Sequence, residues 1–431
     1  MIRLILLVLS LLLATTAFSQ TTAIVGGKVH TVGPKGTLND ATIIIVDGKI
    51  RAVGAGLDIP DGAAIIDATG KIITPGLFSS LGQLGLVEVG MSAGPVDSQQ
   101  RGAQFTAGFD VADAYNPRST LIAINRIEVV TRAAITPSPA YPDDTGNKGH
   151  VLSGLAAVVN LGDDDVLDRR HAAMVVTLGQ GGSFFAAGTR ASAWLILRNA
   201  LDEAADYRDH KSDVERGERR EYQHSIADLE ALQDVIAGNT PILVGINRAS
   251  DIETLVSLTQ TYGLRAIISG GAEAWMVADK IAAAEIPVIL ATTSNLPGSF
   301  DSINARRGSA SILMKAGVKV ALSDSESQTH NARNISQSAG NAVADGITWD
   351  AALRAITLTP AEIYGVDDAV GSIEVGKAAD IVIWPADPLE LTTYAEQVLI
   401  NGVSIPMVSR QTLLRDRYLQ IDSDKPPAYR D

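Results

Sequence analysis

The sequence contains no cysteine among its 431 residues, and only 5% of its side chains are aromatic. Disulfide bonds are therefore excluded, and a packed apolar core must stabilise the chain. Basic residues are also scarce, with 35 lysines and arginines against 49 acidic residues and a net charge of −14. Binding to nucleic acid is not expected, because neutralising phosphates requires a basic face.

Long apolar runs are absent except at the N-terminus, where residues 4–13 read LILLVLSLLL. One early positive charge, this short apolar segment and the small-residue ending Ala17-Phe18-Ser19 are typical of a secretory signal peptide. A membrane span would need about 20 apolar residues. We therefore predict a signal peptide at 1–19, no membrane span, and export of the mature protein to a periplasm.

The sequence does contain strand-like segments at both ends, and between them apolar strand-like runs that alternate with helix-like segments. Residues 42–46 (TIIIV) and 49–53 (KIRAV) flank Asp47-Gly48, which is a strong signal for a hairpin turn. In the middle, apolar runs at 241–246, 265–269, 287–291 and 318–322 start about 22 to 31 residues apart, the length of one strand-helix unit. Runs at 156–160 and 174–178 fit the same series less regularly. Such repeats predict an α/β fold, either a (β/α)8 barrel or an open doubly wound sheet.

Three local features of this middle region carry further expectations. Ser250 and Glu253 form a capping-box pattern, so we expect a helix to begin at Ser250 and to stop at Gly263. The charged run at 201–224 predicts a solvated helix on the outside of the fold. The glycine-rich stretch 177–188 predicts a flexible loop, because it lacks the lysine of a phosphate-binding loop.

Before the alternating region the sequence reads VDGKIRAVG (46–54) and IIDATGKIITPGL (65–77), and after it AALRAITLTPAEIYGVDDAVGSIEVGKAADIVIW (351–384). These stretches, with the strand-helix spacing between them, resemble the amidohydrolase superfamily, in particular its imidazolonepropionase-like and dihydroorotase-like branches. The resemblance implies a TIM-like (β/α)8 barrel at 76–367, a small composite β-sandwich from 20–75 and 368–410, and a C-terminal tail at 411–431. It also implies hydrolysis of carbon-nitrogen bonds with divalent metal, usually zinc, and a possible homo-oligomer.

The metal ligands of that family are missing at the matching positions. Laying the family pattern on Thr74-Pro75-Gly76 puts Ser79 at an aspartate, and Leu81 and Gln83 at the two histidines of the first barrel strand. The histidines of the fifth and sixth strands are likewise replaced, by residues Gly245 or Ile246 and Ser269-Gly270. Leucine cannot bind a metal, and a glutamine oxygen is a weak zinc ligand. We therefore predict no metal and no cofactor.

A census of histidines supports the same conclusion. There are six, and no two lie within four residues of each other. Because His30 lies in the N-terminal β piece, and His210 and His224 lie in the charged run, only His150, His171 and His330 are expected to approach a barrel mouth.

Asp324, which follows the eighth predicted strand, is the candidate catalytic residue, a remnant of the family's acid-base aspartate. With Glu326 and His330 it could hold a metal or act as an acid-base cluster, unless these are solvated loop residues. Gln83, Asn247, His330 and Arg333 are candidate substrate-binding residues, and Arg333 could clamp a carboxylate.

Two functions remain open on the sequence alone. The first is a hydrolase of carbon-nitrogen bonds in cyclic amides or small peptide-like substrates, with a rearranged or metal-independent centre. The alternative is a non-catalytic barrel that keeps the pocket, either as a periplasmic binding protein or as a partner subunit in a hetero-oligomer with an active homologue. Both predict a small-molecule ligand at the barrel mouth.

Overall fold

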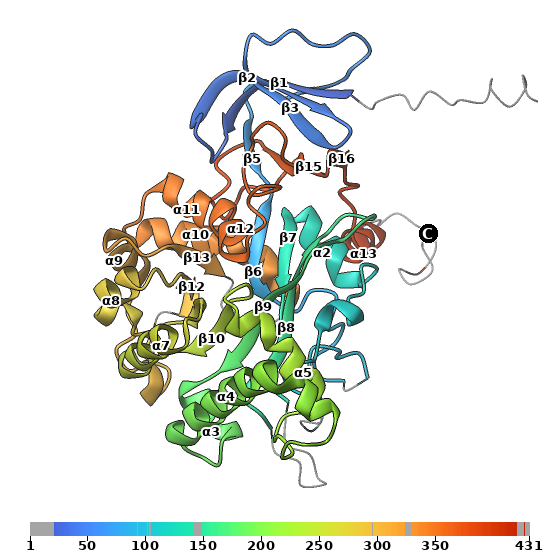
Figure 1. The fold of residues 1–431 in the computed structure, drawn as a ribbon. Coiled ribbons are helices and arrows are strands. Elements are labelled where there is room, and N and C mark those ends of the chain that lie inside the picture. The colour runs from blue at the N-terminus through green and yellow to red at the C-terminus, as the bar shows by residue number, and fades with distance from the viewer. Residues whose placement is uncertain are drawn as a thin grey trace, which may run out of the picture.

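In a computed structural model, residues 21–92, 94–100, 102, 105–140, 149–294, 296–323, 329–419 and 426 are described. They form two eight-stranded sheets, sheet A and sheet B, with helices packed around sheet B (Figure 1). In the described chain, no helix is long and apolar enough to cross a membrane. The predicted signal peptide at 1–19 lies outside the described residues.

Sheet A combines strands from both ends of the chain. Its strands are β1 (Thr21–His30), β2 (Thr37–Val46), β3 (Lys49–Ala55), β4 (Ala64–Asp67), β5 (Ile72–Pro75), β14 (Ile381–Trp384), β15 (Gln397–Ile400) and β16 (Val403–Ser404). Asp47 and Gly48 turn the β2-β3 hairpin with φ of 50° and 79°, as the sequence predicts. The N-terminal and C-terminal pieces join where β5 pairs antiparallel with β14. This confirms the small composite β domain.

Sheet B is the barrel, with strand order β13-β12-β11-β10-β9-β8-β7-β6. Its strands are β6 (Leu77–Gly82), β7 (Val130–Ile135), β8 (Leu152–Asn160), β9 (Leu167–Thr177), β10 (Ile242–Ile246), β11 (Ala266–Gly270), β12 (Val288–Ala291) and β13 (Val320–Ser323). The first and last strands approach each other where Ser80 Oγ donates to the Leu322 carbonyl at 2.6 Å. The barrel-type α/β fold is thus confirmed, with one departure. Strand β8 runs antiparallel to both β7 and β9.

The chain passes from sheet A into sheet B through a single glycine. Gly76 lies between β5 and β6, and its N–H donates to the Asp380 carbonyl at 3.0 Å. A Cβ built on Gly76 would lie 2.2 Å from the Thr131 side chain, so no larger residue fits without a shift. This close approach fixes where β6 begins, and therefore where its far end meets the other barrel strands.

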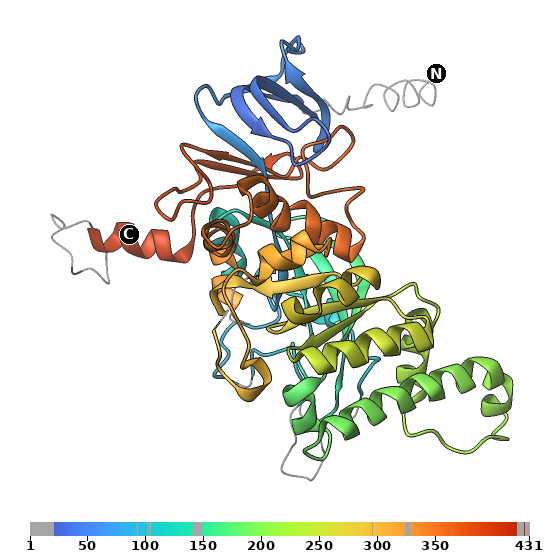
Figure 2. The same ribbon diagram turned by 90° about the vertical axis from the view of Figure 1, so that its left-hand side faces the viewer.

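The helices lie mainly on the outer face of sheet B, and the last one, α13, extends away from the body (Figure 2). Their bounds are η1 (Val111–Ala114), α2 (Thr120–Ile127), α3 (Gly179–Phe185), α4 (Arg190–Glu215), α5 (Ile226–Ala231), α6 (Gln233–Ile236), α7 (Ala249–Tyr262), η2 (Ala274–Val277), α8 (Ala278–Ala283), η3 (Thr292–Ser294), η4 (Phe300–Ser302), α9 (Ser309–Lys315), η5 (Thr329–Asn334), α10 (Ile335–Ala344), α11 (Trp349–Ala355), α12 (Leu358–Tyr364) and α13 (Arg410–Leu419).

Three local expectations need correction. The glycine-rich stretch forms helix α3 rather than a loop, and Ser183 in its last turn donates its hydroxyl to the Gln180 carbonyl at 2.7 Å. Helix α7 begins one residue before Ser250, with Arg248 at its N-cap, and it ends at Gly263 as predicted. The charged run belongs partly to α4, whose Ala200, Leu201 and Ala204 are buried, so this helix packs on the barrel as well as facing solvent.

Candidate functional site

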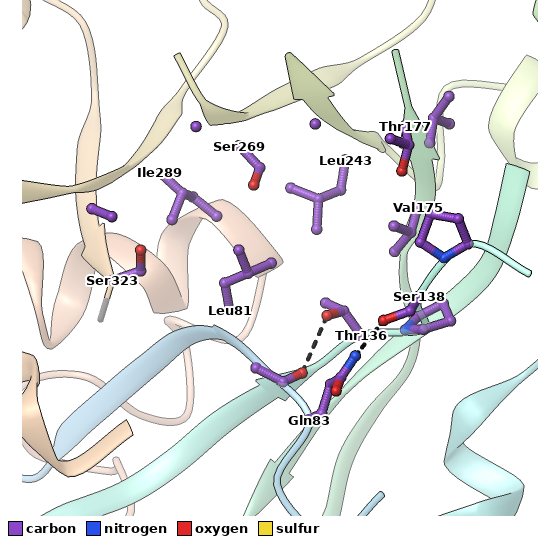
Figure 3. Close-up of a pocket in the computed structure, with 17 residues that line it drawn as sticks. Leu81, Gln83, Thr136, Ser138, Val175, Thr177, Leu243, Ser269, Ile289 and Ser323 are labelled. Atoms are coloured by element: carbon purple, nitrogen blue, oxygen red, sulfur yellow. Dashed lines mark hydrogen bonds between the residues drawn. The ribbon is translucent and has the colours of Figure 1, made fainter. Parts of the chain in front are cut away.

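A cavity of about 300 Å³ lies inside sheet B, at the carboxyl ends of its parallel strands (Figure 3). This volume is at the small end of the range for ligand pockets, and this end of a barrel is where such sites form. The strands that reach it include β6, β9, β10, β11, β12 and β13, so the wall is built almost all the way around.

The deeper wall of the cavity is apolar. Leu81 from β6, Val175 from β9, Leu243 from β10 and Ile289 from β12 contribute it. Leu243 and Ile289 are about 1% exposed and belong to the packed barrel interior. A ligand that reaches this depth must therefore present apolar surface, because the side chains here offer no hydrogen bond.

Hydroxyl groups line the rest of the cavity, and some of them are already paired. Thr136 Oγ1 donates to the Gly82 carbonyl at 3.1 Å. Gln83 Nε2 donates to Ser138 Oγ. Both pairs link the loop after β6 to the chain after β7, so Gln83 and Ser138 form one fixed side of the cavity (Figure 3).

The hydroxyls of Thr177, Ser269 and Ser323 also line the cavity, at the ends of β9, β11 and β13. None of the three has a hydrogen-bond partner for its side chain within the described chain. Gly245 pairs in register with Thr177 on one side and with Ser269 on the other. Because Gly245 has no side chain, the space between these two hydroxyls stays open.

The residues at the expected zinc-ligand positions do come together here. The cavity lining includes residues that the family pattern matches to histidine positions on the first, fifth and sixth strands. They are Leu81, Gln83, Gly245, Ser269 and Gly270. No imidazole or carboxylate lines it in the part of the chain that is described. Nor do three or more acidic or histidine side chains lie close enough to hold a metal ion anywhere in that part. Hydroxyls, one amide and backbone atoms are not a donor set that fits zinc.

The other candidate residues lie elsewhere. Asp324 and Glu326 fall outside the described residues. Asn247 follows β10, and its Oδ1 accepts from the Ala272 N–H at 3.2 Å, which holds the loop after β11. His330 and Arg333 lie in η5, where the Arg333 N–H donates to Asn125 Oδ1 at 2.9 Å. The cavity lining includes neither of these two residues, nor Asn247.

A buried pair of imidazoles, which the sequence analysis missed, lies beside the barrel. The His224 side chain is 6% exposed, its Nδ1 lies 2.8 Å from Glu203 Oε2, and its ring centroid is 5.5 Å from that of His150. The expectation that His224 lies in a solvated charged run is therefore wrong. A usable signal was Glu203 itself, because it lies on α4 among the apolar residues Ala200, Leu201 and Ala204.

Comparisons of the sequence with known proteins find similarity to amidohydrolases. The sequence model described as "Amidohydrolase family" matches residues 196–408. The amidohydrolase tasK of Hapsidospora irregularis is 23% identical in an alignment over 390 residues that covers 83% of this chain. The chain spans only 38% of the length of that relative.

Solved structures show the same fold. An amidohydrolase from Thermotoga maritima MSB8 superposes with a TM-score of 0.78 at 23% identity, covering 89% of this chain and 99% of that one. Molinate hydrolase gives a TM-score of 0.54 at 19% identity, covering 90% and 95% of the two chains.

Proposed function

Since the chain belongs to the amidohydrolase superfamily, we propose that its barrel mouth binds an uncharged small molecule, in place of the metal-dependent hydrolysis that resemblance to the family implies. One observation carries the proposal. The positions matched to metal-binding histidines are Leu81, Gln83, Gly245 and Ser269, and all four line the cavity.

The chemistry of the wall selects the ligand. The described lining residues carry no charge, so an ionic ligand would lose its hydration without a partner. Three hydroxyls that have no side-chain partner among the described residues, those of Thr177, Ser269 and Ser323, offer hydrogen bonds to a carbonyl or hydroxyl group of the ligand, and the apolar wall receives the rest of it. Because the described lining does not fit zinc, the metal-bound water of the family's hydrolysis would be missing here, and such a ligand would be bound and released unchanged.

The first test measures metal and turnover. We expect protein purified without chelator to contain far less than one zinc per chain by elemental analysis, and to leave simple amides and dipeptides unhydrolysed. About one zinc per chain, or turnover that the Asp324→Asn variant abolishes, would overturn the proposal and favour a hydrolase. Asp324 is the informative position for that outcome, because it is the candidate acid-base residue.

The second test fills the cavity. A Cβ on Gly245 would meet nothing closer than the Val176 carbonyl at 3.8 Å, and the backbone there has no positive φ, so Gly245→Val is expected to fold normally. Saturation-transfer NMR with N-methylacetamide and glycerol should show contact with the wild-type protein and a loss of signal with Gly245→Val. Equal signals from both proteins would show that the cavity is not the binding site.

A further inference from the structure

Apolar side chains are exposed on three segments that follow the cavity-lining strands. They are Phe184 in α3, Met276 in η2, and Phe300 and Ile303 in and after η4. Their exposed fractions are 63%, 50%, 88% and 54%. Single exposed apolar residues need no explanation, but a group of them on neighbouring segments marks an interaction site.

These segments are bonded to one another. Asp301 in η4 accepts from Arg190 Nη2 at 2.6 Å, at the start of α4, and its Oδ2 lies 3.5 Å from the Gln180 N–H in α3. On the other side, Trp275 Nε1 in η2 donates to the Asn304 carbonyl at 2.9 Å. The segments that carry the four exposed apolar side chains are therefore tied together by these bonds, and we call the four side chains the apolar rim (Phe184, Met276, Phe300 and Ile303).

The apolar rim borders the cavity along the chain. Thr177 lines the cavity and α3 begins two residues later; Gly270 lines it and leads to η2; Ala291 lines it and leads to the loop that holds η4. In a barrel the loops after the strands surround the mouth. Segments such as these therefore lie beside the path by which a molecule seated among the hydroxyls leaves the cavity.

We propose that the ligand is an amphiphile, with a small uncharged head that bears hydroxyl or carbonyl groups and an apolar chain that lies on the rim. The inference rests on the proposed function, because the head occupies the same cavity. The head is limited by the volume of about 300 Å³ and by the free hydroxyls of Thr177, Ser269 and Ser323. The chain gains the hydrophobic free energy of covering Phe300 and Phe184.

The probe is monooctanoylglycerol below its micelle concentration, compared with glycerol and with sodium octanoate by titration calorimetry and NMR. We expect monooctanoylglycerol to bind at least ten-fold more tightly than either. Glycerol lacks the chain, and octanoate brings a charge into an uncharged cavity. If glycerol binds as tightly as monooctanoylglycerol, the proposal of an amphiphilic ligand is wrong, but the proposed binding cavity is not contradicted. Equal affinity for octanoate would overturn the uncharged head.

Variants separate the two sites. The double variant Phe184→Ser/Phe300→Ser should weaken monooctanoylglycerol about ten-fold and leave glycerol unchanged, whereas Gly245→Val should abolish both. Leu391→Ser is the matched control, because Leu391 is 67% exposed and lies before β15 in the sheet A part of the chain. A loss with this control as large as with the double variant would overturn the inference.

Two further outcomes are decisive. If Gly245→Val leaves monooctanoylglycerol binding intact, the head is not in the cavity, and both the inference and the proposed site fail. If light scattering shows a dimer that Phe184→Ser/Phe300→Ser converts to a monomer, the rim is covered by a second copy, and the inference alone fails.

Discussion

The His150 imidazole lies beside His224, and its Nδ1 accepts a hydrogen bond from the Leu152 N–H at 3.1 Å. Burial and the neighbouring His224 lower the pKa of His150 to about 4, while the Asp228 carboxylate acts in the opposite direction. At the scale of single residues, this makes His150 a neutral ring in the folded protein at pH values where it would be protonated in the unfolded chain.

The consequence is a loss of stability in acid. Above pH 6.5 His150 is neutral in both the folded and the unfolded protein, so it causes no loss of unfolding free energy there. As the pH falls from 6.5 towards about 4, only the unfolded chain binds the proton, and the folded state becomes less stable relative to it. We expect this to cost about 2 to 3 kcal/mol of unfolding free energy at pH 4.5. His150→Gln keeps an acceptor for the Leu152 N–H. Urea unfolding at pH 7.0 and 4.5 should show that the variant loses about this much less unfolding free energy between the two pH values than the wild-type protein does.

His171→Gln is the control, because the His171 side chain is 45% exposed and lies 3.1 Å from Asp110. This variant should keep the acid sensitivity of the wild-type protein. The explanation fails if His150→Gln loses as much stability between pH 7.0 and 4.5 as the wild-type protein does.

At the scale of elements, helix α7 is fixed by a residue from outside it. Glu273 is 4% exposed, and its Oε2 accepts from the Ala249 N–H at 3.0 Å in the first turn of α7. Its Oε1 accepts from Asn304 Nδ2 at 2.9 Å. Glu273→Ala should therefore lower the unfolding free energy by about 1 to 3 kcal/mol, because these donors lose a charged acceptor in a buried place.

The matched variant is Ser250→Ala. Ser250 is exposed and lies inside α7 rather than at its N-cap, and its carbonyl accepts from Thr254 Oγ1 at 3.0 Å. Its replacement should change the unfolding free energy by less than about 0.5 kcal/mol. A larger effect from Ser250→Ala than from Glu273→Ala would restore the capping box that the local sequence suggests.

The barrel strands and helix α7 show which elements the sequence could predict and which it could not. The continuous apolar runs at 241–246, 265–269, 287–291 and 318–322 became β10 to β13, because strands buried on both faces need apolar residues throughout. The direction of β8 was not readable, since its apolar run is compatible with either pairing. The cap of α7 was missed because Glu273 comes from 24 residues away.

At the scale of the whole molecule, the cavity and its surroundings also combine features that the sequence predicts with features that it does not. The positions of Leu81, Gln83, Gly245 and Ser269 were predictable because matching strand ends of a barrel meet at one mouth. The contact between His150 and His224 was not, because it joins segments 74 residues apart through packing that no local pattern records. The resemblance to the family therefore located the mouth, and tertiary packing decided what lies beside it.

The barrel and sheet A are joined by another such contact. Arg132 of β7 is 3% exposed, and its Nη2 donates to Asn401 Oδ1 at 2.6 Å in the turn between β15 and β16. Its Nε lies 2.7 Å from Asp380 Oδ2, and its Nη1 lies 3.2 Å from Asp168 Oδ2. The Asp168 side chain is 21% exposed, and its partial burial raises the pKa of its carboxyl despite the neighbouring arginine.

Replacing this guanidinium should therefore weaken the whole molecule. Arg132→Met leaves the buried Asp380 and the partly exposed Asp168 without their cation, and we expect a loss of about 3 to 5 kcal/mol in urea unfolding. Arg216→Met is the control, because Arg216 is 54% exposed and pairs with Asp213 and Glu218 at the surface, where a pair contributes less than about 1 kcal/mol. If sheet A and the barrel are stabilised independently of Arg132, the two variants will unfold at the same urea concentration. A single transition shifted only by Arg132→Met would instead show that this buried arginine couples the two parts.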